Sequence, residues 1–115
     1  SEEGGVSGLN YVKAKIQHFR FENQNNLKIP HIGWNSVSHQ NNNRLFNSIN
    51  NSHQFYFVHS YHMNAEKQHN LYLSTTNYGY DFISAFAYEH LYGVQFHPEK
   101  SQDQGLQLIK NFCSI

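Results

Sequence analysis

The residues with the clearest capacity for chemistry are His97 and Glu99, which lie two positions apart with Pro98 between them. At the end of a strand, side chains two apart leave the backbone on the same side, and the proline ring fixes the main chain between them. A carboxylate beside a histidine holds one tautomer of the ring and stabilises the imidazolium, while the ring transfers protons. The pair therefore has the chemistry of the base and the orienting acid of a nucleophilic triad. Taken alone, a His-x-Glu more often only caps a sheet edge.

The sequence around this pair predicts a strand, a stop and a helix. Residues 93–96 form a short strand, which Pro98 ends because it cannot donate to a ladder. Ser101, with Gln104 three residues later, is a capping-box pair that starts the helix. The apolar residues that would share one helical face are Leu106, Ile109, Phe112 and Cys113.

Several other segments are predicted as strands. Alternating apolar and polar residues indicate a half-buried strand at 11–17, and Pro30 with Gly33 makes 29–37 an edge or bulged strand. The continuous apolar run at 55–58 is typical of a strand covered on both faces. Further strands are expected at 71–75 and 82–88, with a turn at 77–79, and a helical turn at 44–46.

Residues 93–101, Gly-Val-Gln-Phe-His-Pro-Glu-Lys-Ser, resemble the C-terminal signature of class I, triad-type glutamine amidotransferases. Two more strings, Ile-Pro-His-Ile-Gly-Trp-Asn at 29–35 and Phe-Tyr-Phe-Val-His-Ser-Tyr at 55–61, are similar in order and spacing to those of glutaminase subunits of imidazole glycerol phosphate synthases. The resemblance covers nearly the whole chain. It implies an α/β fold: the C-terminal part of a flavodoxin-like, three-layer α/β/α domain with a mixed, strand-rich sheet, residues 1–115 being a partial amidotransferase domain.

The resemblance also implies a mechanism and a partner. A cysteine thiolate would attack the carboxamide of L-glutamine, and His97 would protonate the departing ammonia and then activate water against the thioester, with Glu99 orienting the ring. No cofactor is implied. The ammonia would pass to a (β/α)8-barrel cyclase subunit and serve histidine biosynthesis.

Other positions match the family one at a time. Ser60 and Tyr61 match the loop whose backbone holds the substrate carboxylate, and Glu3 matches an acid that meets the α-ammonium group. Their plain structural alternatives are a turn and a solvated helix end. The residues that match the face meeting the cyclase are Trp34, Tyr56 and Lys100, for which ordinary packing is the alternative.

The sequence departs from the family at the nucleophile. It contains neither the Gly-x-Cys-x-Gly elbow nor the glycine-rich oxyanion loop. Its single cysteine, Cys113, is expected to be a buried thiol on the apolar face of the last helix. We therefore expect a chain that begins beyond the nucleophile and is inactive alone.

Composition narrows the function further. Eight Lys and Arg balance eight Asp and Glu, so the formal net charge is zero, which argues against nucleic-acid or anionic-membrane partners bound by summed charge. A lone cysteine, with no charged-then-apolar leader and no long apolar run, favours a reducing, cytoplasmic setting.

Three alternatives to the synthase glutaminase stay open at this point. One is a glutaminase subunit of another ammonia-using synthase, and a second is a non-catalytic protein that keeps the docking surface. The third is a metal-binding protein, because the chain has 9 His. Its best ligand candidates are His59, His62 and His69, although positions three apart on a strand face opposite sides and no second Cys or acidic cluster completes a tetrahedral set.

Overall fold

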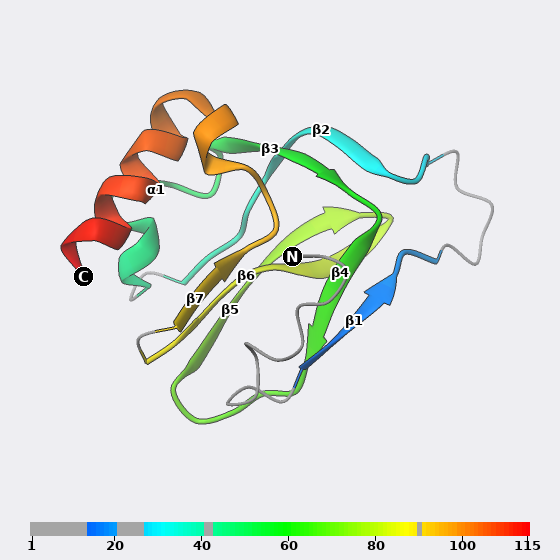
Figure 1. The fold of residues 1–115 in the computed structure, drawn as a ribbon, viewed down its shortest axis with the longest axis horizontal. Coiled ribbons are helices and arrows are strands. Elements are labelled where there is room, and N and C mark those ends of the chain that lie inside the picture. Colours follow the sequence, from blue (N-terminus) through cyan, green and yellow to red (C-terminus); the bar gives the residue numbers. More distant parts are fainter. Residues whose placement is uncertain (1–13, 21–26, 41–42, 90) are drawn as a thin grey trace.

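The computed structural model describes residues 14–20, 27–40, 43–89 and 91–115 (Figure 1). Most of its strands belong to a five-stranded antiparallel sheet. Its members are β1 (Ala14–His18), β4 (Tyr61–Ala65), β5 (Leu71–Tyr78), β6 (Tyr80–Tyr88) and β7 (Leu91–Val94). The order is β1-β4-β6-β5, and β7 also pairs with β6. Because β5 pairs along the whole of β6, β4 and β7 occupy successive parts of the opposite edge of β6.

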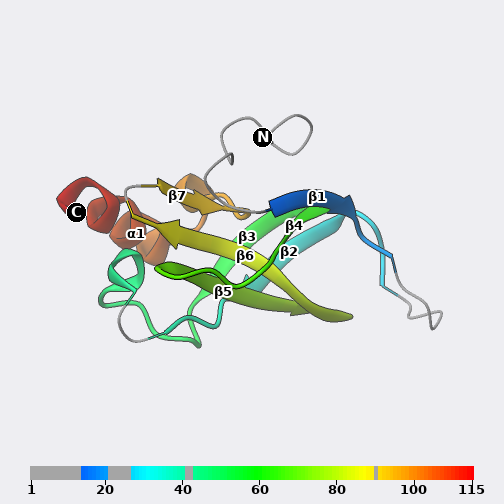
Figure 2. The ribbon, with the colours of Figure 1, turned by 90° about the horizontal axis from the view of Figure 1, so that it is seen from below.

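A second sheet contains only β2 (His31–Ser36) and β3 (Gln54–His59), paired antiparallel. A single residue, Ser60, separates β3 from β4, so one continuous stretch of chain leaves the small sheet and enters the large one. The remaining elements are the 3-10 turns η2 (Arg44–Phe46) and η3 (Pro98–Lys100) and the helix α1 (Gln102–Ser114). Figures 1 and 2 show α1 at one end of the molecule and β1 toward the other.

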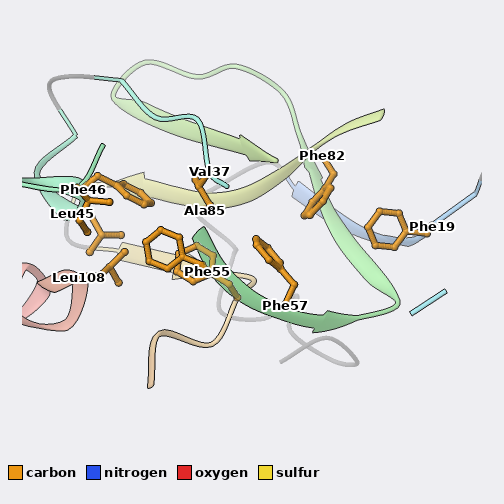
Figure 3. Packing of buried hydrophobic residues seen from close by; sticks show 11 residues of the cluster. Phe19, Val37, Leu45, Phe46, Phe55, Phe57, Phe82, Ala85 and Leu108 are labelled. Atoms are coloured by element: carbon orange, nitrogen blue, oxygen red, sulfur yellow. The ribbon is translucent and has the colours of Figure 1, made fainter. Parts of the chain in front are cut away.

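An aromatic-rich core joins the two sheets to α1 (Figure 3). Phenylalanines alternate inward along β3, as the two-residue period of a strand requires, and meet residues from β6 and α1. The buried cluster consists of Phe19, Val37, Leu45, Phe46, Ile49, Phe55, Phe57, Phe82, Ala85, Phe96 and Leu108. This packing fixes the position of β3 between the large sheet and the C-terminal helix.

The strand-rich α/β class predicted from the sequence is confirmed, and so are the edge strand at β2 and the helical turn at η2. The expected mixed sheet differs in one respect. All strand pairs among the described residues are antiparallel. For β5–β6 and β6–β7 the reason is local, because the turns that join them are too short for the crossover that parallel pairing needs. Of the strand predicted at 11–17, residues 11–13 lie outside the described part.

Three local predictions are wrong. β3 is not covered on both faces, because Val58 is 38% exposed. The turn predicted at 77–79 is tighter, since both strands extend until only Gly79 separates them, with a positive φ of 80° that suits glycine. β7 ends at Val94, two residues earlier than the strand expected to reach residue 96.

The apolar face predicted for the last helix is also wrong. The side of α1 that packs on the core carries Gly105 and Leu108, whereas the predicted face is solvent-exposed. Its four residues are Leu106, Ile109, Phe112 and Cys113, so the thiol is not buried. In the described part of the chain, no helix is both long and apolar enough to span a membrane.

Candidate active site

His97 and Glu99 lie together at the surface, as their spacing predicts. The Nδ1 atom of His97 is 3.1 Å from Oε2 of Glu99. His97 directly precedes η3, which Pro98 opens with its fixed φ, and this turn brings the carboxylate back to the ring. The side chain of His97 is 38% exposed and that of Glu99 is 60% exposed, so the ring is open to a ligand.

The charge state of Glu99 sets the tautomer of the ring. The backbone N–H of Glu99 itself lowers the pKa of its carboxyl group, and the neighbouring His97 and Lys100 lower it further. A carboxylate that is ionised at neutral pH can only accept hydrogen bonds, so Nδ1 of His97 is the donor. The lone pair of the neutral ring is then on Nε2, where a general base carries it.

The backbone of His97 is attached to β3. Its N–H donates a hydrogen bond of 2.9 Å to the carbonyl oxygen of Tyr56. The hydroxyl of Ser101 strengthens the same connection, because it donates to the carbonyl oxygen of His97 at 2.6 Å and accepts from the N–H of Tyr56 at 3.0 Å. Ser101 is fully buried.

The Ser101 contacts correct the predicted capping box. The Ser101 hydroxyl makes no cap bond to α1, and the Gln104 amide donates to the carbonyl oxygen of Gln54. Sequence reasoning missed the hydrogen bonds from Ser101 to Tyr56 and His97, because a long-range partner leaves no local signal.

Gly105 was missed too, although a glycine inside a helical pattern is a recognisable sign of close backbone approach. A Cβ at Gly105 would overlap the carbonyl oxygen of Pro98, so glycine lets α1 pack directly on η3.

An exposed apolar surface lies on the outer side of β2 and β3, and we call it the hairpin face. It consists of Ile32, Trp34, Tyr56 and Val58. Trp34 is opposite Tyr56, with ring centroids 5.7 Å apart, and Ile32 is opposite Val58. Trp34 is 42% and Ile32 is 58% exposed. The structure thus brings together two of the three predicted docking residues, and Lys100 is exposed at the end of η3.

The predicted substrate residues lie further along β3. Ser60 follows the last residue of that strand, roughly 13 Å from Tyr56 at the rise of an extended chain. Tyr61 begins β4 and is 38% exposed. The carbonyl oxygen of Ser60 accepts a hydrogen bond of 3.0 Å from the N–H of Phe19, which anchors the bend to the segment after β1. Glu3 lies outside the described residues.

The histidines proposed as metal ligands do not form a metal site in the described part of the chain. His59 and His62 are buried, and both rings contact Phe19, because the bend at Ser60 turns them to the same side instead of opposite sides. Their ring nitrogens lie within hydrogen-bond distance of protein atoms. His69 is exposed, in the segment between β4 and β5.

Cys113 lies far from the histidine pair. It is exposed near the end of α1, roughly 16 Å along the helix axis from Gln102. The helix begins beside η3 and carries Cys113 away from His97, so this thiol cannot reach the ring.

Comparison with known proteins decides the family. The family model for class I glutamine amidotransferases matches residues 7–115. The chain belongs to this family. The His97–Glu99 pair therefore lies within an amidotransferase domain, in the string of residues that first indicated the resemblance.

Similar curated proteins narrow the kind of amidotransferase. Imidazole glycerol phosphate synthase subunit HisH of Leptospira borgpetersenii is 41% identical over 116 residues, which cover 100% of the chain and 56% of that protein. The subunit HisH 2 of Methanococcus maripaludis is 45% identical over 97% of the chain and 54% of its own length. HisH of Buchnera aphidicola is 45% identical over 99% of the chain and 55% of its own length. The chain thus spans about half the length of the curated relatives it matches.

Proposed function

We propose that this chain provides the acid-base part of a glutaminase site in the amidotransferase subunit of an imidazole glycerol phosphate synthase. The observation that carries the proposal is the contact of 3.1 Å between Nδ1 of His97 and Oε2 of Glu99. The names of the similar proteins support the choice of synthase. The substrate is L-glutamine, and the products are glutamate and ammonia.

In the proposed reaction, a cysteine thiolate attacks the carboxamide carbon of glutamine. The sequence holds no Gly-x-Cys-x-Gly elbow, so this thiolate comes from outside residues 1–115. The imidazolium of His97 gives its Nε2 proton to the departing nitrogen, and ammonia leaves as the thioester forms. Nε2 then takes a proton from water, whose oxygen attacks the thioester and releases glutamate. Glu99 keeps Nδ1 as the donor and stabilises the imidazolium throughout.

The proposed partner is a (β/α)8-barrel cyclase subunit that uses the ammonia, and it docks on the hairpin face. Exposed aromatic residues such as Trp34 are enriched at the centres of protein interfaces, where their burial contributes much of the binding energy. Tyr56 belongs to this face through its side chain and holds His97 through its backbone. Docking there places the barrel next to the site of ammonia release.

Glutamate release tests the proposal. Residues 1–115 are joined to the part of Leptospira borgpetersenii HisH that precedes the matched segment. The resulting protein is called the hybrid subunit below, and the cyclase subunit of that organism is added. We expect glutamine-dependent glutamate release that falls by about 10²–10⁴-fold in His97→Ala. His69→Ala, which changes an exposed histidine away from the site, is the matched control and keeps full activity. An absence of release, or release unaffected by His97→Ala, would refute the proposal.

A further inference from the structure

We infer that His31 and His59 are positioning residues that hold the backbone at Ser60 and Tyr61 through a directed chain of hydrogen bonds. The inference rests on the proposed function and on the match of Ser60 and Tyr61 to the family's loop whose backbone holds the substrate carboxylate. It assigns a task to two buried histidines that the acid-base chemistry of His97 does not use.

The direction of the chain follows from its last acceptor. Nδ1 of His59 lies 2.7 Å from the carbonyl oxygen of Tyr61. A carbonyl oxygen only accepts, so His59 carries its proton on Nδ1 and has its lone pair on Nε2. Nδ1 of His31 is 2.9 Å from that Nε2 atom and must donate to it. The lone pair of His31 is then on Nε2, which faces the side-chain amide of Asn35 at 3.4 Å.

Burial favours the neutral form of His31, and aromatic contacts hold both rings in place. His31 is stacked between Phe57, at 4.8 Å, and Tyr78, at 4.0 Å. His59 contacts Phe19 and Phe82, each at 5.1 Å between ring centroids. The two histidines are only 3% and 2% exposed, and transfer of a charged ring into such a site is costly. Their ring nitrogens therefore face one another, the Tyr61 carbonyl oxygen and the Asn35 amide.

The bend needs such a support because of its place in the fold. Ser60 is the only residue between β3 and β4, where the chain passes from the two-stranded sheet to the five-stranded one. His31 and His59 are register partners on β2 and β3, so their contact joins both strands of the hairpin to the first residue of β4. A change in either ring is transmitted to the Tyr61 carbonyl group and hence to the peptide groups around it.

Amide isosteres separate this role from ordinary core packing. In the hybrid subunit, His59→Phe fills the space and removes the donor to Tyr61, and we expect the KM for glutamine to rise about tenfold with kcat little changed, the loss of one positioning hydrogen bond. In His59→Asn, the amide nitrogen takes the place of Nδ1, and we expect the KM to stay near that of the parent despite the smaller side chain. Phe46→Leu, which loosens the core at the η2 turn, is the control and lowers only the unfolding temperature.

A second measurement does not depend on turnover. The ¹⁵N spectrum of the imidazole groups should show His59 protonated on Nδ1, with a coupling through the hydrogen bond between Nδ1 of His31 and Nε2 of His59. Absence of that coupling, or protonation of His59 on Nε2, would overturn the inference even if glutaminase activity is present. Equal rises in KM in His59→Asn, His59→Phe and Phe46→Leu would also overturn it. If the hybrid subunit releases no glutamate, the proposed function fails, while the spectrum still decides the hydrogen-bond chain.

Discussion

The backbone N–H of His97 donates a hydrogen bond of 2.9 Å to the carbonyl oxygen of Tyr56. Tyr56 faces Trp34 across the hairpin, so its side chain is part of the hairpin face while its backbone holds the histidine. The predicted docking surface and the acid-base pair are therefore joined through one residue of β3. A partner docked on the hairpin face, as we propose, would contact the residue whose backbone holds His97.

The Ser101 hydroxyl should be essential to this connection. Ser101→Ala leaves the N–H of Tyr56 and the carbonyl oxygen of His97 without their shared partner, and we expect it to lower the free energy of unfolding by about 1–3 kcal/mol. Glutamate release should fall with it because His97 loses its anchor. Urea unfolding and kinetics of the hybrid subunit measure both effects. Ser114→Ala, at an exposed serine bonded to Lys110 in the same helix, should leave both within error.

Close packing of α1 on η3 gives a second prediction. Gly105→Ala forces the helix away from Pro98 and should destabilise the protein by about 1–3 kcal/mol, although alanine favours a helix more than glycine does. Lys110→Ala, at an exposed position of the same helix, is the control and should be neutral or slightly stabilising. A stabilised Gly105→Ala protein would show that the contact does not constrain the site.

Two exposed apolar surfaces compete as the docking site, and mutation can distinguish them. Trp34→Ala removes the largest side chain of the hairpin face. We expect the Kd for the cyclase subunit to rise roughly 30-fold, which corresponds to about 2 kcal/mol of binding free energy. Leu106→Ala, on the exposed side of α1, should leave the Kd unchanged. Titration calorimetry with the hybrid subunit measures both. The opposite pattern would place the partner on α1.

Stability should fall in mild acid because of His31. Burial, with a further effect of the adjacent His59, lowers the pKa of His31 from 6.5 to about 4. Between these values the unfolded chain binds the proton and the folded chain does not. The free energy of unfolding therefore has its full value, as far as His31 is concerned, above about pH 6.5, and it decreases by about 3 kcal/mol as the pH falls toward 4. Burial also lowers the pKa of His62, which adds to the loss in the same direction.

Unfolding measured in urea from pH 7 to 4.5 tests this dependence. His31→Asn cannot titrate and should reduce the slope of stability against pH, leaving the contribution of His62. His69→Asn, at an exposed histidine, should leave the slope as it is. An unchanged slope in His31→Asn would mean that the ring is already charged in the folded protein.

The sequence was most informative where local chemistry determines structure. The two-residue spacing of His97 and Glu99, with Pro98 between them, predicted that the two side chains lie together, as they do. The string at 93–101 led to the class I glutamine amidotransferase family, to which the chain belongs. The motif and the proline act over a few residues, so the sequence could indicate them; the contact itself is made by the η3 turn that Pro98 opens and not by the end of β7, which stops at Val94.

Long-range partners were beyond the reach of sequence patterns. The Ser101 hydroxyl was expected to cap α1, and instead it joins His97 to Tyr56, which lies 45 positions before Ser101 in the sequence. The helical period correctly grouped Leu106, Ile109 and Phe112 on one side of α1, but that side faces solvent. Gly105 and Leu108 face the core instead, because the approach of η3, and not the period, decides which side packs. The opposed placement predicted for His59 and His62 failed because the bend at Ser60 interrupts the strand period.

A double-mutant cycle on glutamate release tests the central claim, that His97 and Glu99 act as one acid-base unit in glutamine hydrolysis. His97→Ala, Glu99→Gln and the double mutant are compared in the hybrid subunit with the cyclase subunit present. Because the carboxylate works only through the ring, we predict that Glu99→Gln lowers kcat in the parent and has no further effect in His97→Ala. Fully additive losses would contradict the account, because they would show that the two side chains act independently.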